Sequence, residues 1–130
     1  MRPRILVVDD DPDILDAICD ILGAEGYPVA RARHGLEALE QVARQRPDLI
    51  LLDLMMPVMD GPTFARELRA SYSGQGIPII VISADGNPGR AVSVNARRYL
   101  AKPFDIEVLL SHVAEIAREL DGAGAGAAAP

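Results

Sequence analysis

The feature that most constrains the fold is a repeated order of segments, in which short apolar runs alternate with longer stretches of helical periodicity. The runs Arg4–Val8 and Ile77–Ile82 are rich in branched aliphatic residues, as expected for strands buried on both faces of a parallel sheet. None of the runs approaches the roughly 18 apolar residues of a membrane-spanning helix. The alternation therefore predicts βα units and an α/β fold, a doubly wound parallel sheet with helices on both faces.

The pattern predicts five strands, at Arg4–Val8, Pro28–Arg33, Asp48–Leu52, Ile77–Ile82 and Arg97–Ala101. The second strand alternates arginine with alanine, which is typical of a half-exposed edge. Helices are expected after each strand, and the last one carries an apolar face from Ile106 to Leu120. Glycine, asparagine and proline crowd the segment Ala84–Asn95, so the fourth helix is expected to be short.

Length and composition limit the organisation and the partners. The 130 residues suffice for one domain, predicted at residues 1–120, and the Gly/Ala-rich residues 121–130 are predicted to be a disordered tail or linker stub. A net charge of −6 is repelled by nucleic-acid phosphates, so no direct nucleic-acid binding is expected. Cys19 is the only cysteine, and no signal peptide or membrane segment is evident, so a cytoplasmic setting without membrane partners is expected.

Polar residues directly follow four of the predicted strands. They are Asp9, Asp10 and Asp11 after the first, Asp53 after the third, Ser83 after the fourth and Lys102 after the fifth. The carboxyl ends of parallel strands meet at one edge, where such folds bind ligands. Crowded carboxylates favour Mg²⁺, while a lysine and a hydroxyl suit phosphoryl oxygens. With Asp53 as the attacking group, the pattern predicts an aspartyl phosphate, whereas Asp11 is expected to cap a helix.

Four segments together resemble a known family. They are Ile5-Leu-Val-Val-Asp-Asp-Asp11, Asp48-Leu-Ile-Leu-Leu-Asp53-Leu-Met-Met-Pro57 with Asp60-Gly61, Ile82-Ser83-Ala84, and Tyr99-Leu-Ala-Lys102-Pro103-Phe104. In combination, over about residues 4–120, they look like the receiver domain of bacterial two-component response regulators. The resemblance implies a flavodoxin-like sheet with strand order 2-1-3-4-5. It also implies a cis peptide bond between Lys102 and Pro103, which X–Pro bonds adopt at low cost.

The resemblance further implies a phosphoacceptor and a metal site. Asp53 would accept a phosphoryl group from a sensor histidine kinase or a phosphotransfer protein, as in a phosphorelay. Mg²⁺ would be held by Asp9, Asp10, Asp53 and the backbone carbonyl of Met55. Asp10 and Asp53 are the expected direct ligands, with Asp9 acting through water.

Three further residues match the family's switch. Ser83 and Lys102 would contact the phosphoryl group, and Tyr99 would be the aromatic residue that moves inward on activation. The outcome would be a population shift that changes the surface offered to an unidentified downstream partner or output domain. We therefore expect a signalling switch rather than a metabolic enzyme, with only self-catalysed phosphotransfer and dephosphorylation.

The sequence departs from the family pattern between the fourth and fifth strands. Lys102 lies only 19 positions after Ser83, nearly a helical turn fewer than is usual in this family. We expect the segment Ala84–Asn95 to be short or mobile, which alters the proposed output face. An alternative function is therefore a phosphorylation-independent, receiver-like interaction domain.

Two other classes with related architecture fit less well. A phosphohydrolase of the haloacid-dehalogenase type would need an acid two residues after the nucleophile, where this chain has Met55. A flavodoxin-like cofactor carrier would need Ser, Thr and Gly donors after the first strand. The three aspartates at that place would repel a phosphate instead.

Overall fold

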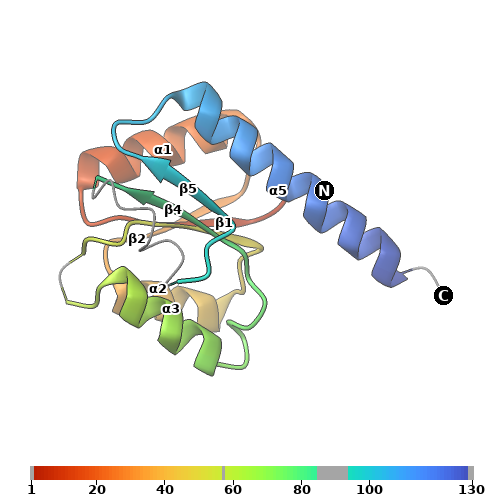
Figure 1. Ribbon diagram of the computed structural model, residues 1–130, viewed down its shortest axis with the longest axis horizontal. Coiled ribbons are helices and arrows are strands. Elements are labelled where there is room, and N and C mark those ends of the chain that lie inside the picture. Colours follow the sequence, from red (N-terminus) through yellow and green to blue (C-terminus); the bar gives the residue numbers. More distant parts are fainter. Residues whose placement is uncertain (1, 57, 85–93, 129–130) are drawn as a thin grey trace.

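Five parallel strands form one sheet in the computed structural model, which describes residues 2–56, 58–84 and 94–128 (Figure 1). The strands are β1 (Ile5–Val8), β2 (Val29–Ala32), β3 (Leu49–Leu52), β4 (Ile79–Ser83) and β5 (Arg98–Ala101). They pair in the order β2-β1-β3-β4-β5, which confirms the predicted sheet. The alternating strand β2 lies at an edge of the sheet, as predicted.

Helices cover both faces of the sheet (Figure 1). On one face lie α1 (Pro12–Ala24) and α5 (Ile106–Ala128), and on the other lie α2 (Gly35–Arg44) and α3 (Gly61–Ala70). Successive strand residues point to opposite faces, so Val7 packs in the cluster under α1 and α5 while Val8 packs in the cluster under α2 and α3. Because both faces are covered, the central strands β1, β3 and β4 are buried along their whole length.

The observed element bounds differ from the predicted ones at two informative places. Strand β4 begins at Ile79 rather than Ile77, because Pro78 has no N–H to donate to a strand ladder. Helix α5 continues to Ala128, although residues 121–130 were predicted to be a disordered tail. The alanines of this segment favour a helix and its glycines oppose one, while extending an existing helix avoids the cost of nucleation. The division into a domain and a linker stub remains a prediction.

The predicted short fourth helix falls on residues 85–93, which lie outside the described part of the chain. The crossover is described only at its two ends. Ala84 follows β4 directly, and Val94 and Asn95 precede β5. Val94 is fully buried against the α2 and α3 face of the sheet.

Side-chain caps begin three of the helices. Asp11 accepts hydrogen bonds from the backbone N–H groups of Asp13 and Ile14, which confirms it as the cap of α1. Asp60 caps α3 in the same way. His34 caps α2, where its Nδ1 accepts the N–H of Glu37 at 3.2 Å. The sequence did not indicate this role, because histidine is not among the usual capping residues.

Replacing His34 with aspartate is expected to stabilise the protein. A carboxylate is a stronger acceptor at this position and interacts favourably with the positive end of the helix dipole, so the free energy of unfolding should rise by about 1 kcal/mol. His34→Ala should lower it by a similar amount, because the N–H of Glu37 loses its partner. Urea denaturation of the three proteins measures both changes, and equal midpoints would show that the cap contributes nothing.

Candidate functional site

The strand register brings the predicted acidic residues together. Val8 pairs with Leu52 across β1 and β3, so Asp9 and Asp53, the next residues, leave the sheet side by side at its carboxyl edge. The N–H of Asp53 donates to the carbonyl of Val8 at 3.0 Å and fixes this position. Carboxylate oxygens of Asp9, Asp10 and Asp53 all lie within 4.8 Å of one another. The predicted acidic cluster therefore exists in the folded chain.

Burial and hydrogen bonds hold two of these carboxylates in place. Asp9 and Asp53 are only 2% and 4% exposed, whereas Asp10 is exposed. Oδ1 of Asp53 accepts the N–H of Met55 at 3.0 Å, and Oδ1 of Asp9 accepts the N–H of Asp11 at 2.9 Å. Each of these two carboxylates uses Oδ1 for a backbone hydrogen bond, which leaves Oδ2 to contact other groups of the site.

Lys102 reaches those second oxygens from the end of β5. Its Nζ lies 2.8 Å from Oδ2 of Asp9 and 3.4 Å from Oδ2 of Asp53. The N–H of Lys102 donates to the carbonyl of Ser83, and its peptide bond to Pro103 is cis, as the resemblance implied. Burial alone would lower the pKa of Lys102, but the hydrogen bond to Asp9 and the charges of both aspartates outweigh it and raise the pKa.

Burial makes Asp53 a weaker acid than an ordinary aspartate. Its desolvation raises the pKa to about 6, and the neighbouring charge of Asp9 acts in the same direction. The N–H of Met55 and the ammonium group of Lys102 oppose the increase without cancelling it. A bound cation would relieve the repulsion between Asp9 and Asp53, and a set of oxygen ligands of this kind fits Mg²⁺.

The raised pKa predicts a pH-dependent stability in the absence of divalent metal. Between the unfolded pKa of 3.8 and the folded pKa of about 6, the native carboxyl binds more protons than the unfolded one. The free energy of unfolding must then fall as the pH rises, by roughly 2 kcal/mol between about pH 4 and pH 7. This change is measured relative to Asp53→Asn, whose side chain at position 53 cannot titrate. Chemical denaturation in EDTA measures the difference between the two proteins. A difference that is constant across this range would contradict the raised pKa.

The structure also locates the remaining predicted residues. Ser83 is fully buried at the end of β4, where it pairs with Ala101 of β5. Tyr99 is half-buried on β5, and its hydroxyl oxygen is buried without a hydrogen-bond partner among the described residues. Met55 contributes its N–H to Asp53, while its side chain is 52% exposed. The roles assigned to the Met55 carbonyl and to Tyr99 remain predictions.

One structural requirement of the site was missed at the sequence level. Gly61 begins α3 directly beneath the chain that follows Asp53. A Cβ atom at this position would lie 2.7 Å from the Cα of Leu54 and 3.3 Å from the carbonyl oxygen of Asp53. The Asp60-Gly61 pair indicated a turn, but the need for glycine comes from this close approach of two backbones.

An acidic cluster and a lysine at the carboxyl edge of a doubly wound sheet define a receiver-type signalling domain. The family model described as the response regulator receiver domain matches residues 5–114, and the chain belongs to this family. The family membership confirms the resemblance inferred from the motifs. None of the helices in the described part of the chain is long and apolar enough to cross a membrane.

Relatives and solved structures agree with this assignment. The response regulator MprA of Mycolicibacterium vanbaalenii is 40% identical over 98% of this chain, which spans only 57% of that relative. The chemotaxis response regulator CheY4 of Vibrio cholerae has a TM-score of 0.82 and 31% identity, covering 89% of this chain and 99% of its own. The receiver domain of sensor histidine kinase PA1611 from Pseudomonas aeruginosa has a TM-score of 0.82 and 32% identity, covering 90% and 98%. That structure holds a magnesium ion in its active-site cleft.

Proposed function

We propose that Asp53 accepts a phosphoryl group from the phosphohistidine of a sensor histidine kinase or a phosphotransfer protein. An oxygen of the Asp53 carboxylate bonds to phosphorus, the P–N bond breaks, and the imidazole leaves. The observation that carries this proposal is the position of Asp53, buried at the carboxyl edge with one oxygen held by Met55 and the other facing Lys102. Family membership supports the same reaction.

The surrounding residues have distinct parts in this reaction. Asp9, Asp10, Asp53 and the carbonyl of Met55 would hold Mg²⁺, with Asp10 and Asp53 in direct contact and Asp9 acting through water. The ion, when bound, neutralises charge that develops on the phosphoryl oxygens. Lys102 supplies a second positive charge beside Asp53, and its ion pair with Asp9 holds it there before phosphorylation.

The phosphorylated site is proposed to change the surface offered to a partner. A phosphoryl group adds about −1.5 to −2 charges, which attract Lys102 and the hydroxyl of Ser83. Tyr99 is suited to follow this change, because its buried hydroxyl has no partner among the described residues in the present state. The partner is an output domain or a separate protein. In this role the domain is a switch rather than a metabolic enzyme, and the cytoplasm is its proposed location.

The proposal is tested by the intact mass of the protein after incubation with acetyl phosphate, with and without Mg²⁺. We expect one phosphoryl adduct that forms only with the metal. Absence of the adduct, in protein shown by calorimetry to bind Mg²⁺, would overturn the proposal and favour the phosphorylation-independent interaction domain. Family membership does not favour that alternative.

A further inference from the structure

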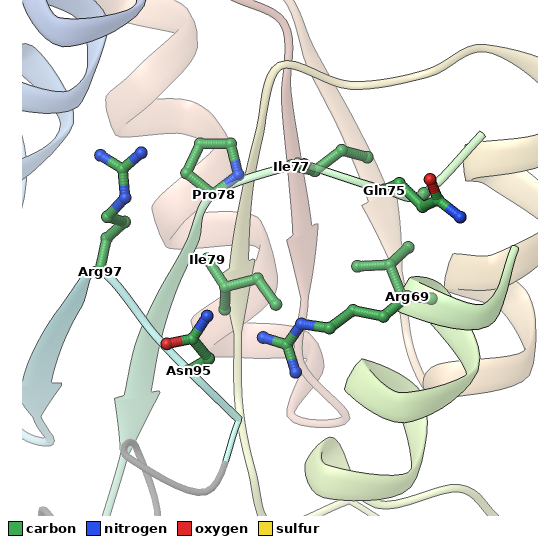
Figure 2. Close-up of a pocket in the computed structure, with 10 residues that line it drawn as sticks. Arg69, Gln75, Ile77, Pro78, Ile79, Asn95 and Arg97 are labelled. Carbon is green, nitrogen blue, oxygen red and sulfur yellow. The ribbon is translucent and has the colours of Figure 1, made fainter. Parts of the chain in front are cut away.

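A second concave site lies at the opposite edge of the sheet from the acidic cluster. It is a pocket of about 390 Å³ between the end of α3, the loop that leads into β4, and the residues that precede β5 (Figure 2). This volume falls within the range of about 300–1,000 Å³ that is typical of small-molecule sites. Because it lies at the amino ends of β4 and β5, the phosphorylation site does not account for it.

The floor of the pocket is formed by buried apolar side chains. Leu68 of α3 and Ile79 of β4 are 1% and 2% exposed, and Ile77 and Pro78 are also buried. The adjoining loop is fixed by Arg46, which donates to the carbonyl oxygens of Ser73 and Gln75 at 3.1 and 2.7 Å. The pocket is thus formed before any ligand arrives, which reduces the entropic cost of binding.

The polar groups at the pocket are amides and cations. Arg69 extends from α3 toward Asn95, and its guanidinium group donates to the backbone carbonyl of Val94 (Figure 2). Arg97 points away from Arg69 and pairs with Glu119 of α5. No aspartate or glutamate is among the described residues that line the pocket, although the chain contains 19 acidic residues.

Arg69 is therefore the principal charge available to a ligand. A guanidinium group has five N–H donors in a planar fork, so the bond to Val94 leaves donors for a carboxylate. Among the described residues, no carboxylate lies within ion-pair distance of Arg69. Asn95, held at a φ of 55°, also lines the pocket.

We propose that this pocket binds a small organic carboxylate with a flat apolar body. The carboxylate pairs with Arg69 and receives a hydrogen bond from the amide of Asn95, while the apolar body lies along the loop of residues 74–78, beside Ile77. The ligand would contact both α3 and the residue pair Val94 and Asn95, through which the chain enters β5. Binding is independent of Asp53.

The test uses benzoate as the probe and the neutral benzamide as its matched control. Each is titrated into ¹⁵N-labelled protein, and backbone amide shifts are followed by NMR. For a probe of this size we expect saturable shifts at residues 74–77, 79 and 95–97 with a dissociation constant on the order of 1–10 mM. Benzamide should bind at least about tenfold more weakly, because it cannot form the ion pair.

Variants distinguish the pocket from other cationic sites. Arg69→Gln should weaken benzoate binding about tenfold, and Asn95→Gly should weaken it less. Glycine is the replacement at position 95 because it accepts the positive φ without strain. Arg66→Gln, the same change at another exposed position of α3, should leave binding unchanged. Asp53→Asn should also bind benzoate normally, which separates this proposal from the proposed phosphorylation.

Three results would overturn the proposal. The first is the absence of saturable shifts for benzoate at the pocket residues. The second is equal binding of benzoate and benzamide, which would exclude the carboxylate contact. The third is an equal loss of affinity in Arg66→Gln and Arg69→Gln, which would show that benzoate binding depends on the net charge of the protein and not on Arg69 itself.

Discussion

Replacing Asp53 with alanine is expected to abolish the Mg²⁺-dependent phosphoryl adduct completely. The exposed carboxylate of Asp10 remains near the site, but it lacks the backbone donor that Met55 provides to Asp53. Asp9 is buried, and Nζ of Lys102 lies 2.8 Å from its second carboxylate oxygen, Oδ2. The geometry therefore offers one acceptor, and the loss should exceed about a hundredfold in adduct yield, since the reacting group itself is removed.

Two further variants make this prediction specific. Asp53→Asn keeps the size of the side chain and an oxygen that accepts the N–H of Met55, so it should fold like the wild type and still form no adduct. Asp20→Ala removes an exposed carboxylate from α1 and should be phosphorylated normally. An adduct of undiminished yield on Asp53→Asn would place the phosphoryl group on another residue. Intact mass and peptide mapping measure both outcomes.

Gly61→Ala is expected to disturb the fold and the site together. The added methyl group would lie 2.6 Å from Cδ2 and 2.7 Å from Cα of Leu54, so the backbone after Asp53 must move. Overpacking against backbone atoms should lower the free energy of unfolding by about 2 kcal/mol or more. Because Leu54 lies between Asp53 and Met55, the rate of adduct formation should fall as well, by roughly tenfold for a displacement near 1 Å.

Gly23→Ala is the matched control for this substitution. Gly23 lies within α1, and a Cβ atom there would meet nothing within 4 Å. Alanine should therefore stabilise the helix by up to about 1 kcal/mol and leave phosphorylation unchanged. Thermal unfolding and the initial rate of adduct formation compare the two variants. If Gly61→Ala retains wild-type stability and rate, the close approach at Leu54 does not constrain the site.

Most of the architecture follows from local patterns. The apolar runs at β1, β3 and β4 are buried on both faces, and the last helix carries its predicted apolar residues Leu109, Val113 and Ile116 into the core. These elements were predictable because the spacing of apolar residues along the chain indicates which side chains are buried. The extension of α5 to Ala128 was not predicted, since a Gly/Ala-rich segment has no apolar period that would separate a helix from a disordered tail.

The residues of the candidate site could be predicted from the sequence, but the contacts between them could not. Residues that follow parallel strands must meet at one edge, so Asp9, Asp53 and Lys102 were expected together. The sequence did not indicate that Lys102 would lie closer to Asp9 than to Asp53. The cap at His34 was also missed, because it depends on a side-chain rotation that no motif records.

The sequence by itself determined the order of strands and helices, the acidic edge and the family, because each depends on residue type and spacing along the chain. The tertiary structure alone decided the ion pair between Lys102 and Asp9, which joins residues 93 positions apart. It also decided the raised pKa of Asp53, the close approach at Gly61 and the pocket beside Arg69. These properties depend on burial and on distances between separate elements, which are set only when the strand register and the helix packing are in place.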